Sequence, residues 1–306
     1  MPSPPRCPGP LVVASFYRFA ALADLADHQR QLRAVAAAAD VRGTILLAGE
    51  GINGTICGAA AAVDTVLAQL RTIPGMAALE ARHSHAPQQV FARLKVRLRR
   101  EIVTFGVPGL HPYLEAPVGT LVPPDQWDGL IADPHTLVID TRNRYEVAVG
   151  SFEGAIDPDT ASFRDFPAWA ERELRPLVER SQPRALALFC TGGIRCEKAT
   201  AWLRQEGFSG VHHLQGGILR DLAERPGAGG RWRGDCYVFD GRVALGPGLR
   251  PGDHSLCHAC GLPLSAGDRA RPGYEEGVSC HQCIDRYSDA DRARFAERQR
   301  QLRGRR

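Results

Sequence analysis

The chain has 306 residues, of which 44% are hydrophobic and 24% charged, and its formal net charge is +4. These values are typical of a soluble globular protein, and the length predicts two or three domains. The longest apolar runs, such as residues 44–48 and 185–189, are far shorter than the roughly 20 residues that a membrane-spanning helix requires. We therefore expect no membrane span.

The first residues, Met-Pro-Ser-Pro-Pro-Arg, lack the long apolar core of a signal peptide, which predicts a cytoplasmic location. The chain contains nine cysteines. Because the cytosol keeps thiols reduced, these cysteines argue against a disulfide framework and point instead to chemistry, metal binding and packing.

The first hundred residues alternate predicted strands and helices. Their order, βαββαβ, predicts a ferredoxin-like α+β domain, which we assign to residues 1–108 and to RNA binding. The stretch 74–89 shows no clear pattern. The predicted strands are 11–19, 42–48, 51–57 and 90–105, and the predicted helices are 22–39 and 59–71.

The last of these strands carries a basic stripe. Its alternation places Phe91 and the cations on one face and apolar side chains on the other. Four cations without an acid fit a surface that follows a phosphate backbone, and a solvated outer face is the alternative. The predicted RNA-binding residues are Arg93, Lys95, Arg97 and Arg99, and the apolar face consists of Ala92, Leu94, Val96 and Leu98.

A Pro- and Gly-rich linker, 106–124, follows, and a second linker lies at 226–230. Between them, strands alternate with helices, which predicts a parallel sheet with ligands at the carboxyl ends of its strands. We assign this α/β domain to residues 109–230. The predicted strands are 137–140, 185–189 and 211–214, and the helices are 144–149, 166–180, 197–206 and one after 215–218.

A cysteine and a glycine-rich loop follow the strand 185–189. Residues 190–195 read Cys-Thr-Gly-Gly-Ile-Arg and open a helix. Loop amides and a helix N-terminus favour negative charge, so the pKa of Cys190 should lie well below the ordinary value of about 8.5. Arg195 adds a positive charge, and Gly192 and Gly193 permit the required backbone torsions. The alternative is an ordinary turn that carries a buried cysteine.

The length of this loop discriminates between two chemistries. A tyrosine-phosphatase loop has five residues between cysteine and arginine, whereas Cys190 and Arg195 are separated by four. The smaller ring suits a sulfur or a small oxyanion, and Cys196 stands where a phosphatase has its arginine. The loop therefore argues against a phosphatase.

The third part of the chain, 231–306, contains two C-x-x-C pairs. Cys257, Cys260, Cys280 and Cys283 have the spacing of a structural zinc ribbon. Redox C-x-x-C motifs or unligated cysteines are the alternatives, and His258 and His281 are not expected to be ligands. Residues 289–306 predict a charged helix with a basic tip, which is either solvated or attracted to RNA.

Several segments together resemble known families. Residues 138–142, 145–146 and 150–156, with the Cys190 loop, resemble a rhodanese domain. The chain as a whole resembles the bacterial tRNA uridine hydroxylases that carry a central rhodanese domain. That wider resemblance rests on residues 47–55 (LAGEGINGT), 163–166 (FRDF), 190–198 (CTGGIRCEK), 213–218 (HLQGGI) and 236–240 (CYVFD).

The resemblance implies oxygen-dependent conversion of the wobble uridine of tRNA to 5-hydroxyuridine. Cys190 matches the essential family cysteine, and Cys196 matches a second cysteine. The surrounding loop consists of Thr191, Gly192, Gly193, Ile194 and Arg195. Molecular oxygen is then a co-substrate and tRNA the partner, and the sequence carries no flavin, haem or NAD motif. It specifies no oligomeric state.

Two chemical hypotheses and two rival functions stay open at this point. Either the Cys190 thiolate adds to C6 of uracil, or an oxidised Cys190 transfers the oxygen. The main rival function is a sulfurtransferase that acts on tRNA or a carrier protein. A non-catalytic RNA-binding scaffold is the second rival.

Overall fold

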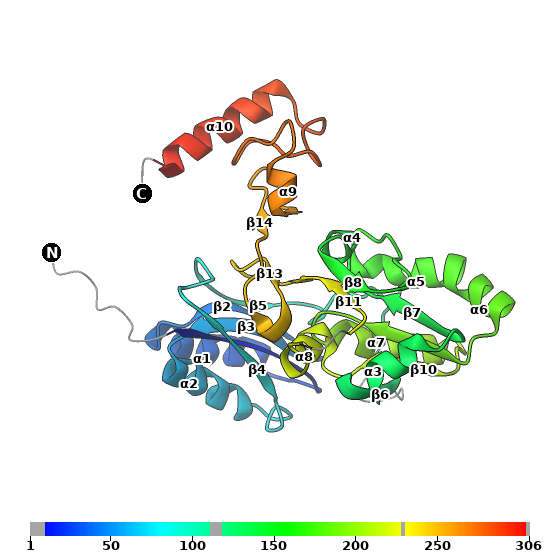
Figure 1. Cartoon of the computed structure of the whole chain (residues 1–306). Helices are drawn as coiled ribbons and strands as arrows, with labels where there is room; N and C mark the ends of the chain where they lie inside the picture. The colour runs from blue at the N-terminus through cyan, green and yellow to red at the C-terminus, as the bar shows by residue number, and fades with distance from the viewer. Residues whose placement is uncertain (1–9, 111–117, 228–229, 304–306) are drawn as a thin grey trace.

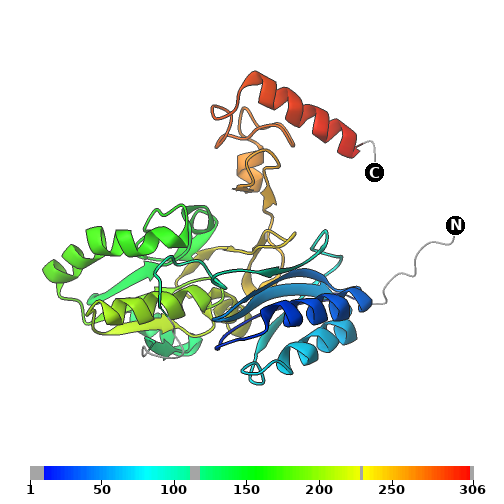
Figure 2. The same cartoon turned by 180° about the vertical axis from the view of Figure 1, so that it is seen from behind.

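The computed structural model describes residues 10–110, 118–227 and 230–303. Two α/β units lie side by side, and a smaller C-terminal part stands off from them (Figure 1). The view from behind shows the same arrangement (Figure 2). No helix in the described parts of the chain is both long and apolar enough to cross a membrane.

The first unit is a five-stranded sheet with the strand order β4-β1-β3-β2-β5. The β2–β5 pair is parallel and the other pairs are antiparallel. The helices α1 (Leu25–Ala38) and α2 (Ala60–Arg71) cover one face of this sheet. The strands are β1 (Leu11–Phe19), β2 (Arg42–Ala48), β3 (Gly51–Gly58), β4 (Ala81–Ala86) and β5 (Leu94–Leu98).

This topology confirms the predicted ferredoxin-like arrangement but corrects its last strand. The strand that completes the βαββαβ order is β4, which lies in the stretch that showed no pattern. β4 is a half-exposed edge strand with the sequence ARHSHA, so its sequence carries little hydrophobic alternation. Within the predicted strand 90–105, only β5 is extended, and it adds to the opposite edge, beside β2.

The two faces of this sheet differ in character. Ile45, Leu47 and Val96 belong to the apolar cluster beneath the two helices. The strand register places polar side chains on the opposite face, which is free of helices: Ser15, Tyr17, Asn53, Thr55 and Arg82. This open face is turned toward the second unit, where it lines a cavity.

The second unit is a parallel sheet with the strand order β6-β10-β9-β7. Apolar side chains of α3 and α8 pack on one face, and those of α5 and α7 pack on the other. This confirms the predicted parallel α/β domain. Its strands are β6 (Thr120–Val122), β7 (Thr136–Asp140), β9 (Ala185–Phe189) and β10 (Val211–Leu214), with β8 (Gly150–Phe152) outside the sheet.

The helices of this unit refine the predicted boundaries. The predicted helix 166–180 consists of α5 (Phe166–Trp169), a π-helical stretch η2 (Ala170–Leu174) and α6 (Arg175–Ser181). Pro176 cannot donate a backbone hydrogen bond, which accounts for the irregularity. The other helices are α3 (Pro124–Ala132), α4 (Arg144–Val147), η1 (Phe163–Asp165), α7 (Ile194–Gln205) and α8 (Gly217–Glu224).

The first predicted linker is shorter than expected, whereas the second lies between α8 and β11 as predicted. β6 and the start of α3 occupy the end of the stretch 106–124, whose residues 111–117 lie outside the described chain. Residues 228–229 of the second linker also lie outside the described residues. After this linker, β11 (Trp232–Gly234) pairs with β8. The third part of the chain therefore begins against the second unit.

The C-terminal part has little regular structure before its final helix. A short hairpin, β12 (Cys236–Tyr237) and β13 (Ala244–Leu245), precedes the cysteine-rich segment. The predicted charged helix is α10 (Asp289–Arg303), and the basic tip at 304–306 lies outside the described residues. The remaining elements are η3 (Pro247–Leu249), β14 (Ser255–Leu256), β15 (Pro263–Leu264) and α9 (Ala266–Arg269).

Candidate active site

Cys190 lies immediately after β9, at the carboxyl end of the parallel sheet, and α7 begins four residues later. Gly193 makes the turn into α7 with φ of +105°, a conformation that L side chains rarely adopt. The backbone of the loop 215–217 packs closely against this turn. The backbone N–H of Ile218 donates to the Cys190 carbonyl, 3.0 Å away, and a Cβ atom at Gly217 would lie 2.5 Å from the same oxygen.

The sulfur of Cys190 is completely buried and sits in a cradle of hydrogen-bond donors. The Gly193 N–H donates to Sγ at 3.1 Å. Burial alone would raise the pKa of Cys190. The thiol of Cys196, the charge of Arg195 and the backbone N–H groups of Cys196 and Gly193 outweigh this effect and lower the pKa to about 5. This balance favours the thiolate form of Cys190 at neutral pH.

Arg195 is held in place by a carboxylate. Its Nη1 and Nη2 atoms lie 2.7 and 2.8 Å from the two oxygens of Glu146, and both side chains are buried. Nη2 also donates to Thr191 Oγ1 at 3.1 Å. Burial raises the pKa of Glu146, but the charge of Arg195 and its hydrogen bonds reverse this and lower it. Glu146 belongs to the segment 145–146 that resembles a rhodanese domain, but the sequence did not predict that it binds Arg195.

Cys196 occupies the first turn of α7, beside the Cys190 sulfur. Thr141 Oγ1 lies 3.7 Å from its Sγ. Burial raises the pKa of Cys196 well above its ordinary value, and the neighbouring Cys190 raises it further. Cys196 therefore stays a thiol and acts as a hydrogen-bond donor to Cys190.

The open face of the first sheet contacts the same loop. Arg82 Nη1 donates to the carbonyl oxygens of Gly192, at 2.8 Å, and Gly216, at 2.5 Å. The Tyr17 hydroxyl donates to Glu197 Oε1 at 2.8 Å, and a Cβ atom at Gly193 would lie 2.7 Å from the hydroxyl oxygen. Two side chains of the first unit thus fix the Cys190 loop.

Tyr17 and Glu197 form a half-buried pair of titratable groups. Burial is the main cause that raises the pKa of each group, and the negative charge of Cys190 adds to it. The hydrogen bond from Tyr17 opposes the rise in the pKa of Glu197. Sequence reasoning missed Tyr17 and Arg82 because they are more than 100 residues away from the loop and acquire their role only through the fold.

Side chains from all three parts of the chain line a cavity of about 900 Å³. The first sheet contributes Asn53 and Arg82, and the Cys190 loop contributes Thr191, Gly192, Ile194 and Arg195. Ile194 also packs against the first unit, near Phe19 and Ile102. Cys190 is not among the described residues that line the cavity. Its sulfur lies behind the loop that forms the cavity wall.

The basic stripe shares the open face of the first sheet. Lys95 and Arg97 pair with Thr44 and Leu46 of β2, which line the cavity. Arg99 also lines the cavity, and Arg93 and Lys95 line a smaller hollow beside it. On the opposite face, Val96 is buried and Leu94 half-buried. Leu98, at the end of the edge strand β5, is exposed, and so is Ala92, which precedes the strand. The predicted apolar face is therefore only partly packed.

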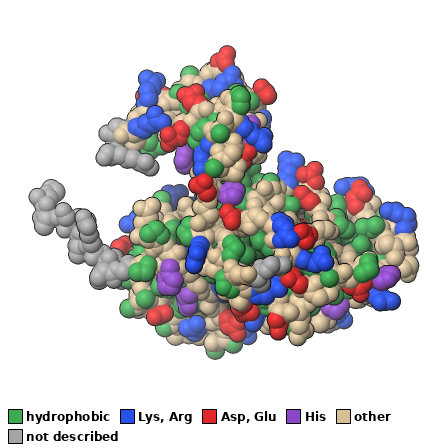
Figure 3. Space-filling view, viewed as in Figure 1, with side chains coloured by type: hydrophobic (Ala, Val, Ile, Leu, Met, Phe, Trp, Pro, Cys, Tyr) green, Lys and Arg blue, Asp and Glu red, His purple; other side chains and the backbone are tan. Residues whose placement is uncertain are grey.

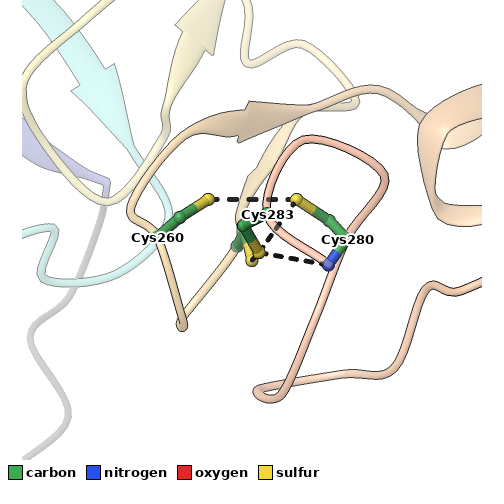
Figure 4. A group of neighbouring side chains, drawn as sticks. Cys260, Cys280 and Cys283 are labelled. Carbon is green, nitrogen blue, oxygen red and sulfur yellow. Dashed lines mark hydrogen bonds between the residues drawn. The ribbon is translucent and has the colours of Figure 1, made fainter. Parts of the chain in front are cut away.

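The four cysteines of the C-terminal part converge on one point, and their sulfur atoms all lie within 4.8 Å of one another. Figure 4 shows Cys260, Cys280 and Cys283 pointing toward a common centre. The Sγ atoms of Cys257 and Cys283 are 3.9 Å apart, and those of Cys260 and Cys280 are 3.8 Å apart. Tetrahedral zinc with Zn–S bonds of about 2.3 Å requires S–S separations of about 3.8 Å. The cluster therefore fits such an ion.

The charges of α10 are largely neutralised within the C-terminal part. Arg292, Arg294 and Arg300 pair with acids three residues earlier, and Arg303 pairs with Glu276. Figure 3 shows basic and acidic side chains interspersed over this part, at the top of the view. These pairs favour a solvated helix over a helix attracted to RNA.

The fold and the cysteine loop define a rhodanese-domain protein with an additional N-terminal domain. Residues 11–102 match the UPF0176 acylphosphatase like domain, and residues 123–221 match the Rhodanese-like domain. The chain is 54% identical over 302 residues to the tRNA uridine(34) hydroxylase of Synechococcus sp. (strain CC9605), with 95% of this chain and 91% of the relative covered.

Two other relatives with the same name come from Deinococcus radiodurans and Caulobacter vibrioides. The first is 49% identical, covering 98% of this chain and 97% of the relative. The second is 52% identical, covering 95% of this chain and 92% of the relative. The chain therefore belongs to the tRNA uridine(34) hydroxylase family, which confirms the resemblance found in its sequence.

Proposed function

We propose that this protein hydroxylates uridine 34 of tRNA to 5-hydroxyuridine, with molecular oxygen as co-substrate. The observation that carries the proposal is the Cys190 thiolate, which is held by backbone N–H groups beside a cavity large enough for a nucleotide. The name of the relatives, which align over nearly the whole chain, supports the choice of substrate. We infer a cytoplasmic location from the same substrate.

The chemistry follows from the electron-poor C6 atom of uracil. Addition of the Cys190 thiolate to C6 makes C5 nucleophilic. C5 then takes one oxygen atom of O₂, and the other leaves as water after two electrons arrive from an external reductant. Loss of the C5 proton and elimination of the thiolate restore the ring. Glu197, at the cavity wall, accepts that proton.

This scheme requires Cys190 to become accessible, because its side chain is buried behind the loop. A small shift of Thr191 and Gly192 would open the sulfur to the cavity that these two residues line. The Gly192 carbonyl is bound by Arg82 of the first unit, so the movement of the loop and the contact between the two units are coupled.

The test is mass spectrometry of nucleosides from tRNA that has been incubated with the protein under air and under argon. We expect 5-hydroxyuridine from the wild-type protein under air only, and none from Cys190→Ala under either gas. Cys57→Ala removes a buried cysteine of the first unit and serves as the control that keeps activity. Absence of the product with wild-type protein in air, with a reductant supplied, would refute the proposal.

The match to the rhodanese-like domain supports one alternative, sulfur transfer through a Cys190 persulfide. Sulfur transfer from thiosulfate to tRNA or a carrier protein, without any 5-hydroxyuridine, would favour this alternative. If Cys190→Ala changed neither reaction, the chain would have to be a non-catalytic RNA-binding scaffold.

We assign RNA binding, catalysis and zinc binding to three segments of the chain. Residues 1–108 bind RNA, with the phosphate backbone following Arg93, Lys95, Arg97 and Arg99. Residues 109–230 carry the reaction through Cys190 and Arg195. Residues 231–306 bind zinc through Cys257, Cys260, Cys280 and Cys283, and the fit of the sulfur separations supports zinc over an unligated cluster. Four thiolates leave no open coordination position, so the ion is structural.

A further inference from the structure

A tight turn at residues 238–243, between β12 and β13, connects all three parts of the chain. The Val238 N–H donates to the Val243 carbonyl at 2.8 Å, and the Gly241 N–H donates to the Val90 carbonyl at 2.9 Å. The hairpin that contains this turn begins directly after β11, which pairs with β8 of the second unit. The turn is therefore anchored to both α/β units.

A buried ion pair gives the turn further rigidity. Arg242 Nη2 lies 2.6 Å from Asp240 Oδ2, and both side chains are almost completely buried. Arg242 Nη1 donates to Ser84 Oγ of β4 at 2.7 Å. Because the guanidinium is committed to these partners, it is not available to bind a ligand phosphate.

This rigid turn presents an exposed aromatic ring. Phe239 is 61% exposed, more than any other large hydrophobic side chain in the described residues. Single exposed apolar side chains are common on protein surfaces. Phe239 differs from such residues because it lines the cavity that also contains Arg82, Thr191 and Gly192. Its ring is perpendicular to that of Tyr237, with centroids 5.2 Å apart, and its large exposed fraction leaves ring surface open to the cavity.

We propose that Phe239 is the stacking platform for an unpaired base of the tRNA anticodon loop, at the cavity that uridine 34 enters. This inference rests on the proposed function. RNA loops are recognised by splaying bases out and stacking them on exposed aromatic side chains, and each such contact contributes strongly to affinity. Asn53 and Ser84 line the same cavity and offer hydrogen-bond partners for base edges.

The test measures binding of an anticodon stem-loop RNA and the KM for its hydroxylation. Phe239→Leu keeps an apolar side chain but removes the ring, and we expect affinity to fall about tenfold and KM to rise in parallel. Phe239→Trp should bind like wild type, because it restores a stacking face. Leu121→Ala is the matched control, since Leu121 is 49% exposed and is not among the described residues that line the cavity.

A fluorescent purine placed on either side of uridine 34 identifies the stacked base. We expect its fluorescence to be quenched when the RNA binds the wild-type protein but not when it binds Phe239→Leu. The inference is wrong if Phe239→Leu binds within about twofold of wild type while wild type hydroxylates the RNA. Failure of the proposed function can be distinguished from failure of this inference. In that case the wild-type protein would form no 5-hydroxyuridine, whatever the binding measurement gave.

Discussion

The ionised sulfur of Cys190 depends on neighbours that compensate for its burial. Burial raises the pKa of a thiol, and here the hydrogen bond from the Cys196 thiol is the largest of the effects that lower it. The folded state therefore favours the deprotonated form, and the thiolate is lost as the pH falls through about 5. A free thiol would lose its charge near pH 8.5.

This balance predicts different pKa values of Cys190 for two substitutions of Cys196. Cys196→Ala removes the donor and should raise the pKa of Cys190 by about one to two pH units, the equivalent of one hydrogen bond to a charged group. Cys196→Ser keeps a donor and should leave the pKa near its wild-type value. The ultraviolet absorbance of the thiolate, measured against Cys190→Ala as baseline, gives the midpoint. A wild-type midpoint near 8.5 would contradict the account.

Tyr17 is expected to act on the reaction through Glu197. Tyr17→Phe keeps the ring but removes the hydrogen bond that lowers the pKa of this carboxyl. The pKa of Glu197 should rise, and a base with a higher pKa is protonated at higher pH. The acid limb of the kcat profile should therefore move to higher pH. An unchanged profile, with normal thermal unfolding, would remove Glu197 from the proposed mechanism.

At the scale of single elements, β5 combines an edge position with two cations on the open face, the half-buried Lys95 and the exposed Arg97. Lys95→Glu with Arg97→Glu should weaken RNA binding by at least about tenfold and reduce the salt dependence of binding. The control reverses two exposed arginines outside the lining of the cavity, Arg180 and Arg204. If both double variants weaken binding equally, general charge is responsible and β5 has no particular role.

The elements also show which features a sequence can reveal. β9 was predictable because all five of its residues are buried and apolar. β4 and β6 are edge strands with exposed positions, so hydrophobic periodicity does not mark them. The Cys190 loop was recognisable because its donors are contiguous in the chain. Glu146, Tyr17 and Arg82 reach that loop only through tertiary contacts, which no local pattern records.

At the scale of the whole molecule, a buried lysine joins the two α/β units. Lys198 of α7 lies 2.9 Å from Glu50 Oε2 and 2.7 Å from Glu101 Oε2, and it donates to the Val103 carbonyl at 3.0 Å. All three acceptors belong to the chain that precedes the second unit. This cluster holds the open sheet face against the reactive loop.

Removing the lysine should therefore loosen the whole molecule. Lys198→Met leaves two carboxylates without their cation and should lower the free energy of unfolding by about 3–5 kcal/mol. Adding Glu50→Gln and Glu101→Gln should recover part of this loss, because no buried charge is then unpaired. Urea unfolding measures both effects. Equal stability of wild type and Lys198→Met would show that the cluster does not hold the units together.

The cysteine-rich end of the C-terminal part, residues 255–303, should depend on its metal for folding. Its apolar cluster consists largely of the cysteines themselves, with Leu264 between them. Zinc analysis should give one ion per chain, and a strong chelator should unfold this part while leaving the two α/β units intact. Cys257→Ser should mimic the chelator, whereas Cys236→Ser should retain the ion. Full thermal stability of the C-terminal part after complete removal of metal would contradict this expectation.

The central claim is that Cys190 supports transfer of an oxygen atom from O₂ to uridine 34. Incubation of tRNA under isotopically heavy dioxygen, followed by mass spectrometry of its nucleosides, tests this most directly. We predict that 5-hydroxyuridine from the wild-type reaction carries one heavy oxygen atom and that Cys190→Ala forms none. Product whose new oxygen comes from water, or equal product from Cys190→Ala, would contradict the account.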